Sequence, residues 1–144
     1  VRFRAASYRA SFGSEEGLSD EMGDNDSHYR ERLLNHITEV PDGNVHLWSD
    51  SKIIGQAEMK LIADASIGYV SLFFIEPECR RLGLGRLLHN HACSVFKAMG
   101  KNSVQLSVSR TNLPAQAFYD CLGWENLGPR PGHESSFLMR YVLS

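Results

Sequence analysis

The feature that most constrains the fold is a run that passes from an apolar strand, through a turn with two glycines, into a helix. Residues 67–75 read IGYVSLFFI, are apolar on both faces as in a central strand, and are followed by a Glu-Pro pair. The next segment, CRRLGLGRLL at 79–88, holds Gly83 and Gly85 where a helix should begin. Glycines weaken a helix start, so we expect something to approach the backbone closely there.

Hydrophobic periodicity and turn residues predict the other elements around this unit. They are a helix at about 27–40, a hairpin at 45–63, a helix after Gly85 that closes at Gly100, a strand at 103–109, a helix that ends at Gly123 and a final strand at 136–144. This order predicts an α/β (α+β) fold with a mixed, mostly antiparallel sheet and helices on both faces. A chain of 144 residues is long enough for one core, so we expect a single domain at 1–144.

Composition excludes several classes of protein. The formal net charge of −2 argues against general attraction to nucleic acid or a membrane, and no apolar run approaches the roughly 20 residues of a membrane span. The N-terminal VRFRAASYRA lacks the apolar core of a signal peptide. Cys79, Cys93 and Cys121 are odd in number and widely spaced, which favours neither a disulfide framework nor a metal site. We expect no metal and a reducing, cytoplasmic compartment.

The glycine turn has the geometry of an anion site. A strand, a glycine turn and a helix start aim backbone N–H groups and the positive end of a helix dipole at one point, which suits a phosphate. A Walker loop is excluded because Arg86-Leu87 stands where Lys-Ser or Lys-Thr is needed. A dinucleotide fingerprint is excluded because Leu88 replaces its third small residue. The turn alone leaves an anion site and a strained turn with solvated arginines equally open.

A second segment decides between them. NLPAQAFYDCLGW at 112–124 combines Asn112, Ala115, a Phe-Tyr pair and a Gly-Trp pair. Together with Arg80-x-x-Gly83-x-Gly85 after a buried strand, it resembles the GNAT superfamily of acetyl-CoA-dependent N-acetyltransferases. The resemblance covers roughly residues 45–144 and is strongest at 67–124.

The resemblance implies where acetyl-CoA, the expected cosubstrate, binds. The backbone amides of the glycine turn would cradle the pyrophosphate of coenzyme A, and the strand end at Phe74 and Ile75 would pair with the pantetheine arm, which Asn112 helps to hold. One departure from the family pattern is Leu82, where many members carry a polar residue. The cofactor-binding residues implied are Phe74, Ile75, Arg80, Arg81, Leu82, Gly83, Leu84, Gly85, Arg86, Asn112 and Tyr119.

The resemblance and the chemistry agree on a proton donor. Acyl transfer to an amine needs an oriented thioester, a donor for the developing oxyanion, a neutral amine and a proton for the departing thiolate. Tyr119 matches the family tyrosine that lies beside the sulfur. For the base, Glu58 and Glu76 are the catalytic candidates, although each is also explained as a solvated strand-end acid. Further carboxylate and imidazole candidates are Glu78, His46 and His133.

We therefore expect an N-acetyltransferase that moves an acetyl group from acetyl-CoA to a primary amine by direct attack in a ternary complex. The alternatives are a non-catalytic acyl-CoA-binding or regulatory module of the same fold and, more weakly, a partner-binding domain. The acceptor stays open among small amines, antibiotics, peptide N-termini and lysine, as does a homodimer. The acidic segment at 14–26 is either solvated surface or, if the resemblance holds there, a funnel for cationic acceptors.

Overall fold

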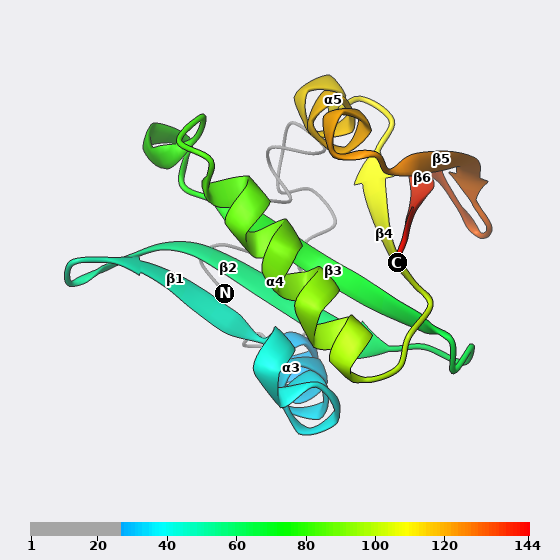
Figure 1. Ribbon diagram of the computed structural model, residues 1–144, viewed down its shortest axis with the longest axis horizontal. Coiled ribbons are helices and arrows are strands. Elements are labelled where there is room, and N and C mark those ends of the chain that lie inside the picture. Colours follow the sequence, from blue (N-terminus) through cyan, green and yellow to red (C-terminus); the bar gives the residue numbers. More distant parts are fainter. Residues whose placement is uncertain (1–26) are drawn as a thin grey trace.

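The computed structural model describes residues 27–144, which form one six-stranded sheet and three α-helices (Figure 1). The acidic segment at 14–26 lies outside the described residues. Two short 3₁₀ turns, η2 (Pro41–Gly43) and η3 (Pro77–Cys79), follow α3 and β3. The elements in chain order are α3 (Ser27–Glu39), β1 (Val45–Ser49), β2 (Lys52–Leu61), β3 (Ile67–Ile75), α4 (Leu84–Ala98), β4 (Ser103–Ser109), α5 (Leu113–Leu122), β5 (Glu125–Arg130) and β6 (His133–Val142).

The sheet is mixed and mostly antiparallel, as predicted. Its strand order is β1-β2-β3-β4-β6-β5, and only the central pair, β3 and β4, is parallel. The parallel pair is joined by α4, which is the crossover that such a connection requires. The hairpin, the central strand and the three predicted helices all lie within a few residues of their predicted bounds.

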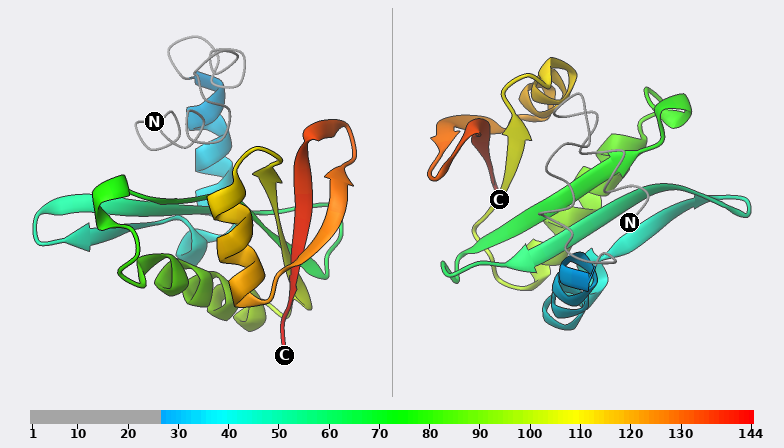
Figure 2. Two further views of the ribbon diagram at one scale, coloured as in Figure 1. Left: turned by 90° about the horizontal axis from the view of Figure 1, so that it is seen from above. Right: turned by 180° about the vertical axis from the view of Figure 1, so that it is seen from behind.

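Helices lie on both sides of the sheet. In the left panel of Figure 2, α4 lies below the sheet and most of α3 lies above it. α4 packs its buried residues Leu88, Ala92 and Phe96 onto the sheet. A side chain at Gly68 of β3 would collide with the Phe96 ring, so this glycine allows the helix to lie close to the strand. The main core therefore lies between α4 and the centre of the sheet.

One edge strand was not predicted. β5 reads ENLGPR and pairs only with β6, with irregular register around Pro129. Glycine and proline lower strand propensity, and proline is tolerated in a sheet mainly at an edge, where one side of the strand needs no partner. The segment is held in the sheet by its neighbour rather than by its own sequence.

The two central strands separate halfway along their length. The β3–β4 register runs from Ile67↔Ser103 to Val70↔Leu106 and stops there, although both strands continue. At this point Ser71 is an extra residue in β3, because Glu58 pairs with Leu72 while the next residue of β2 pairs with Val70. A bulge of this kind bends a strand and increases its twist. Within residues 27–144, the second half of β3 therefore pairs with β2 and no longer with β4. We call the edge where β3 has separated from β4 the open edge of β3.

Candidate active site

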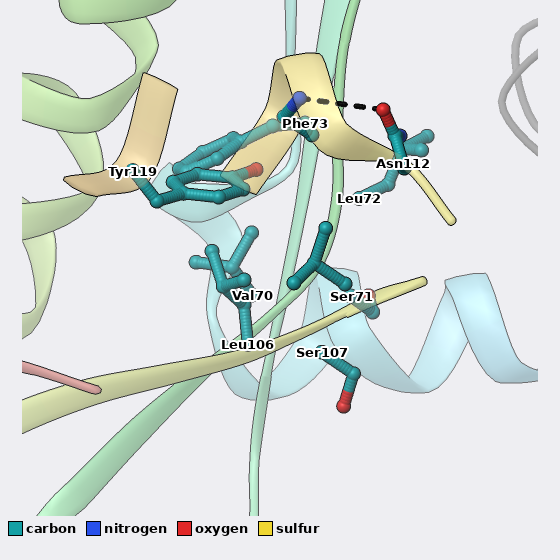
Figure 3. Close-up of a pocket in the computed structure, with 10 residues that line it drawn as sticks. Val70, Ser71, Leu72, Phe73, Leu106, Ser107, Asn112 and Tyr119 are labelled. Atoms are coloured by element: carbon teal, nitrogen blue, oxygen red, sulfur yellow. Dashed lines mark hydrogen bonds between the residues drawn. The ribbon is translucent and has the colours of Figure 1, made fainter. Parts of the chain in front are cut away.

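A pocket lies where β3 and β4 separate. It has a volume of about 100 Å³ and is walled by both strands and by the first turns of α5 (Figure 3). The register break explains it, because strands that stayed paired would leave no space between their backbones. The lining residues are Val70, Ser71, Leu72, Phe73, Leu106, Ser107, Val108, Asn112, Ala115 and Tyr119.

Tyr119 presents its hydroxyl group to this pocket. The residue is 9% exposed, and Figure 3 shows its ring reaching from α5 over the pocket. Burial raises the pKa of Tyr119 well above its ordinary value of 10, because the charged form is poorly solvated there. The side chain therefore stays protonated at neutral pH and can act as a proton donor rather than as a base.

The segment around Tyr119 is fixed at both ends of α5. Asn112 caps the first turn, where its Oδ1 accepts the N–H of Ala115 at 3.3 Å. At the other end Gly123 adopts φ +95°, and the N–H of Trp124 donates to the carbonyl of Tyr119 at 3.0 Å. This is a Schellman motif, in which the residue after the glycine commonly packs back onto the helix. Here the Trp124 and Tyr119 rings meet edge to face, with centroids 5.5 Å apart.

The glycine turn leads from β3 into α4 with its amides open. Gly83 has φ +80° and Arg81 has φ +65°, and left-handed residues within a turn gather backbone N–H groups into a concave anion site. Within the described chain, no hydrogen bond is found from the N–H groups of residues 81–86, and no side chain caps α4. Apart from its neighbours in the chain, no atom of residues 27–144 lies within 4 Å of a Cβ built at Gly83, and the side chains of Arg81 and Arg86 are exposed.

Two residues of the turn are engaged with the protein itself. Arg80 donates its Nε–H to the carbonyl of Ile75 at 2.9 Å and lies over the ring of Phe74. A Cβ at Gly85 would lie 2.9 Å from the ring of Phe118 on α5. Gly85 therefore lets the two helices approach each other. This packing is a second reason for a glycine at this position, in addition to the predicted approach of a ligand to the backbone. Because of this approach, the glycine turn and α5 lie side by side.

A buried hydrogen bond also joins the two helices. His89 of α4 is buried, and its Nδ1 accepts the indole N–H of Trp124 at 3.1 Å. Tyr141 of β6 packs edge to face on His89, with centroids 4.8 Å apart. Burial, followed by the nearby positive charge of Arg86, lowers the pKa of His89 below its ordinary value. A neutral imidazole is what the hydrogen bond requires, because an indole N–H needs an acceptor.

The three carboxylates considered as general bases lie in different surroundings. Glu58 is 2% exposed, accepts a hydrogen bond from Gln56 Nε2 at 3.0 Å and pairs in register with Leu72, which lines the pocket. Glu76 is half-buried just beyond the end of β3. Glu78 lies on η3 and forms an exposed ion pair with Lys52 at 3.2 Å.

The two histidine candidates, His46 and His133, are both exposed, one on β1 and one at the start of β6. Neither lines the pocket. Phe118 and Trp124 belong to the motif found in the sequence, which gave them no role in the site. Sequence reasoning missed Ser71 and His89. For His89 a signal was available, because Gly85 and His89 are four residues apart and so share a face of a helix.

The comparison with known families agrees with this geometry. Residues 10–124, well over half of the chain, match the acetyltransferase (GNAT) family. The chain belongs to this family. The [ribosomal protein bS18]-alanine N-acetyltransferase of Salmonella typhimurium is 28% identical over 110 residues, which cover 70% of this chain and 72% of that protein.

A second relative is matched over a smaller part of its length. The mycothiol acetyltransferase of Beutenbergia cavernae is 31% identical over 80 residues, which cover 56% of this chain but only 27% of the relative. Among solved structures, the PaiA N-acetyltransferase of Thermoplasma acidophilum in complex with coenzyme A has the same fold, with a TM-score of 0.77 and 24% identity. That match covers 98% of this chain and 89% of the other.

The predicted fold and family are therefore confirmed, and this domain is an acetyl-CoA-dependent N-acetyltransferase of the GNAT family. The roles of individual residues stay predictions. Among residues 27–144, no helix is long and apolar enough to cross a membrane. In the same range, no three His, Cys, Asp or Glu side chains lie together in a way that could hold a metal ion.

Proposed function

We propose that this domain transfers an acetyl group from acetyl-CoA directly to a primary amine while both substrates are bound. The observation that carries the proposal is the line formed by the open amides of residues 81–86, the open edge of β3 and the pocket under Tyr119. It offers a phosphate site, a strand edge and a proton donor in the order in which coenzyme A presents its pyrophosphate, its pantetheine amides and its sulfur.

Each part of acetyl-CoA has a proposed binding partner. The pyrophosphate binds the amides of residues 81–86, with the exposed cations of Arg81 and Arg86 beside it. The pantetheine arm adds to the open edge of β3 as an extra strand would, next to Phe74 and Ile75. Arg80 acts indirectly, because its guanidinium group holds the carbonyl of Ile75 at the end of that edge.

The chemical step needs no covalent acetyl-enzyme. The amine nitrogen attacks the thioester carbon, the carbon–nitrogen bond forms, and the carbon–sulfur bond breaks as the intermediate collapses. A backbone N–H at the open edge of β3 stabilises the oxyanion, and Tyr119 gives its proton to the thiolate. Burial raises the pKa of the Cys93 thiol, which makes it a poor nucleophile.

Glu58 is the better of the two proposed bases. Its register partner Leu72 lines the pocket, and the hydroxyl group of Ser71 donates to its backbone carbonyl at 3.3 Å. Glu76 lies farther along, past the end of β3. An alkylammonium acceptor has a pKa of about 10.4, so it must lose a proton to such a group or to water before it attacks.

The acceptor is proposed only as a class. The relative from Salmonella typhimurium is named for acetylating the alanine of a ribosomal protein, which makes a peptide N-terminus the first acceptor to test here. We also propose that residues 1–144 form a single domain and that the protein acts in the cytoplasm. A homodimer is an assembly to be tested by sedimentation rather than a part of the mechanism.

A thiol-release assay tests the proposal. Purified protein is supplied with acetyl-CoA and, in turn, a peptide with N-terminal alanine, a peptide with internal lysine, a polyamine and an aminoglycoside, and free coenzyme A and acetylated product are measured. We expect one class to give equal amounts of both. Coenzyme A binding without acetylated product for every amine would contradict catalysis and leave an acyl-CoA-binding module.

Tyr119→Phe is the matched variant, because it removes one hydroxyl group and keeps the ring. We expect acetyl-CoA affinity to be retained and kcat to fall by about 10²–10⁴-fold, the usual contribution of general acid catalysis. Wild-type turnover across pH 6–10 would instead assign Tyr119 to packing.

A further inference from the structure

His89 joins the two parts of the site, although neither phosphate binding nor proton transfer uses it. It lies on α4 one helical turn after Gly85, and it accepts the indole N–H of Trp124, which directly follows α5 and Gly123. The hydrogen bond is 3.1 Å long and both side chains are buried. It therefore ties the helix that begins at the glycine turn to the helix that carries Tyr119.

Trp124 is in turn fixed to Tyr119 in two ways. Its backbone N–H donates to the carbonyl of Tyr119 at 3.0 Å, and the two rings meet at 5.5 Å and an angle of 61°. Tyr141 closes the cluster from β6, 4.8 Å from the His89 ring and 5.6 Å from the Trp124 ring. In such a packed cluster a shift of Trp124 cannot occur without a shift of Tyr119.

The hydrogen bond also defines which ring nitrogen of His89 carries the proton. An indole N–H only donates, so Nδ1 is unprotonated and the proton is on Nε2, which lies 3.8 Å from the sulfur of Cys93. A side chain without an acceptor at this place would leave the buried indole N–H unpaired, which is unfavourable and drives the ring toward another position.

We propose that His89 is a positioning residue for acetyl transfer: by accepting the indole N–H of Trp124, it holds Tyr119 with its hydroxyl group directed into the pocket. This inference rests on the proposed role of Tyr119 as proton donor. It assigns to His89 no contact with either substrate, because the Trp124 ring lies between His89 and Tyr119 in the chain of contacts.

The primary test compares His89→Leu with His89→Asn, measured with acetyl-CoA and the best amine of the panel. Leu removes the acceptor, whereas the Asn side-chain oxygen can take the place of Nδ1. We expect His89→Leu to lower kcat at least about tenfold with the KM for acetyl-CoA within about threefold, since small misplacement of a catalytic group is costly. His89→Asn should keep kcat within about threefold. Equal kcat values for Leu and wild type, or equal losses for Leu and Asn, would overturn the proposal.

Trp124→Phe tests the same hydrogen bond from the other side and serves if His89→Leu does not fold. It should lower kcat about as much as His89→Leu does, and the double variant should lose little more, because both changes remove one interaction. If the kcat losses of His89→Leu and Trp124→Phe were fully additive in the double variant, the two residues would not act through the same hydrogen bond. Cys93→Ala is the control, since it removes only the weak contact to Nε2 and should leave kcat unchanged.

The Tyr119→Phe background separates positioning from a general structural effect. If His89 acts through the Tyr119 hydroxyl group, His89→Leu should lower kcat no further in that background. A further tenfold loss would overturn the inference while leaving the role of Tyr119 intact. If Tyr119→Phe itself has wild-type turnover, the proposed function of that hydroxyl group fails first, so the two failures can be told apart.

Indole proton exchange gives a readout that does not depend on turnover. The N–H of buried Trp124 should exchange slowly in the wild type and in His89→Asn, and much faster in His89→Leu. Trp48, which is 57% exposed, is the internal control and should exchange equally fast in all three proteins. Unchanged protection of Trp124 in His89→Leu would show that His89 does not hold it.

Discussion

The two helices at the site begin in opposite ways. α5 begins with a complete cap, in which Asn112 accepts the N–H of Ala115 and the first turn packs against the pocket. α4 begins after Gly83 with no side-chain cap and with the N–H groups of residues 81–86 unpaired within the described chain. Unpaired N–H groups at a helix start are normally satisfied by caps, by water or by a ligand, and we propose a ligand for this start beside a strand edge.

The two helix starts should respond differently to substitution. At the start of α5, the protein satisfies its own backbone, so a substitution there should act first on stability. At the start of α4, where we propose that the backbone binds a ligand, a substitution should act first on acetyl-CoA affinity. Gly85 belongs to both regions, because it lies in the first turn of α4 and against Phe118 of α5.

Gly85→Val should therefore have the largest effect. Its Cβ would lie 2.9 Å from the Phe118 ring, and overpacking of this kind costs typically about 1–3 kcal/mol. The displaced ring adjoins Tyr119, with centroids 5.3 Å apart, so we expect loss of acetyl-CoA binding together with lower stability. Urea unfolding and calorimetric titration measure the two effects. Combining the change with Phe118→Ala should restore part of the stability, and a failure to do so would mean that Phe118 is not what the valine meets.

Asn112 gives an intermediate effect that separates capping from binding. Asn112→Ala removes the cap and should cost about 1 kcal/mol, whereas Asn112→Asp keeps a capping oxygen and should cost little. Both variants lose the amide NH₂ group of a residue that lines the pocket, so both should raise the KM for acetyl-CoA. If Asn112→Ala and Asn112→Asp were equally unstable, the capping oxygen would contribute nothing to stability. The start of α5 would then not differ from that of α4 in the way described above.

The pH dependence of stability gives the smallest effect. Burial and Arg86 lower the pKa of His89, so the unfolded chain binds a proton near pH 6.5 that the folded chain resists. The free energy of unfolding should therefore fall as pH drops below about 6.5 and be unaffected by this group above it. Urea unfolding from pH 5 to 8 should show a shallower fall in His89→Asn than in the wild type. The same fall in both proteins would assign the dependence to other groups.

Much of the fold could be predicted from the sequence because its signals are local. The strand at 67–75, the glycine turn and the two following helices are each specified by apolar spacing and by their terminal glycines. β5 could not be predicted, because ENLGPR forms a strand only through its pairing with β6. The register break at Ser71 could not be predicted either, since bulges depend on which residues face each other across strands.

The same limit applies to the site. Tyr119 and Asn112 could be predicted from a motif, and both line the pocket. The Gly85–Phe118 approach and the His89–Trp124 hydrogen bond join residues 33 and 35 positions apart, and no local pattern reports such contacts. The sequence predicted that both Gly83 and Gly85 allow a ligand to come close to the backbone. For Gly83 this is the one reason proposed, whereas Gly85 also allows α4 and α5 to pack together.

Two glycines at opposite ends of α4 provide a matched test of the proposed phosphate site. Gly83 and Gly100 have φ values of +80° and +78°, and apart from neighbours in the chain no atom of residues 27–144 lies within 4 Å of a Cβ built at either. Each Gly→Ala change should therefore cost a similar backbone strain of about 1–2 kcal/mol. The measurement is calorimetric titration of acetyl-CoA into the wild type, Gly83→Ala and Gly100→Ala.

Gly83→Ala should bind acetyl-CoA at least about tenfold more weakly than the wild type, because its methyl group and its altered backbone disturb the open amides. Gly100→Ala, with matched strain at the far end of the helix, should bind with wild-type affinity. Equal affinities for all three proteins would contradict the assignment of residues 81–86 as the phosphate site of this acetyltransferase.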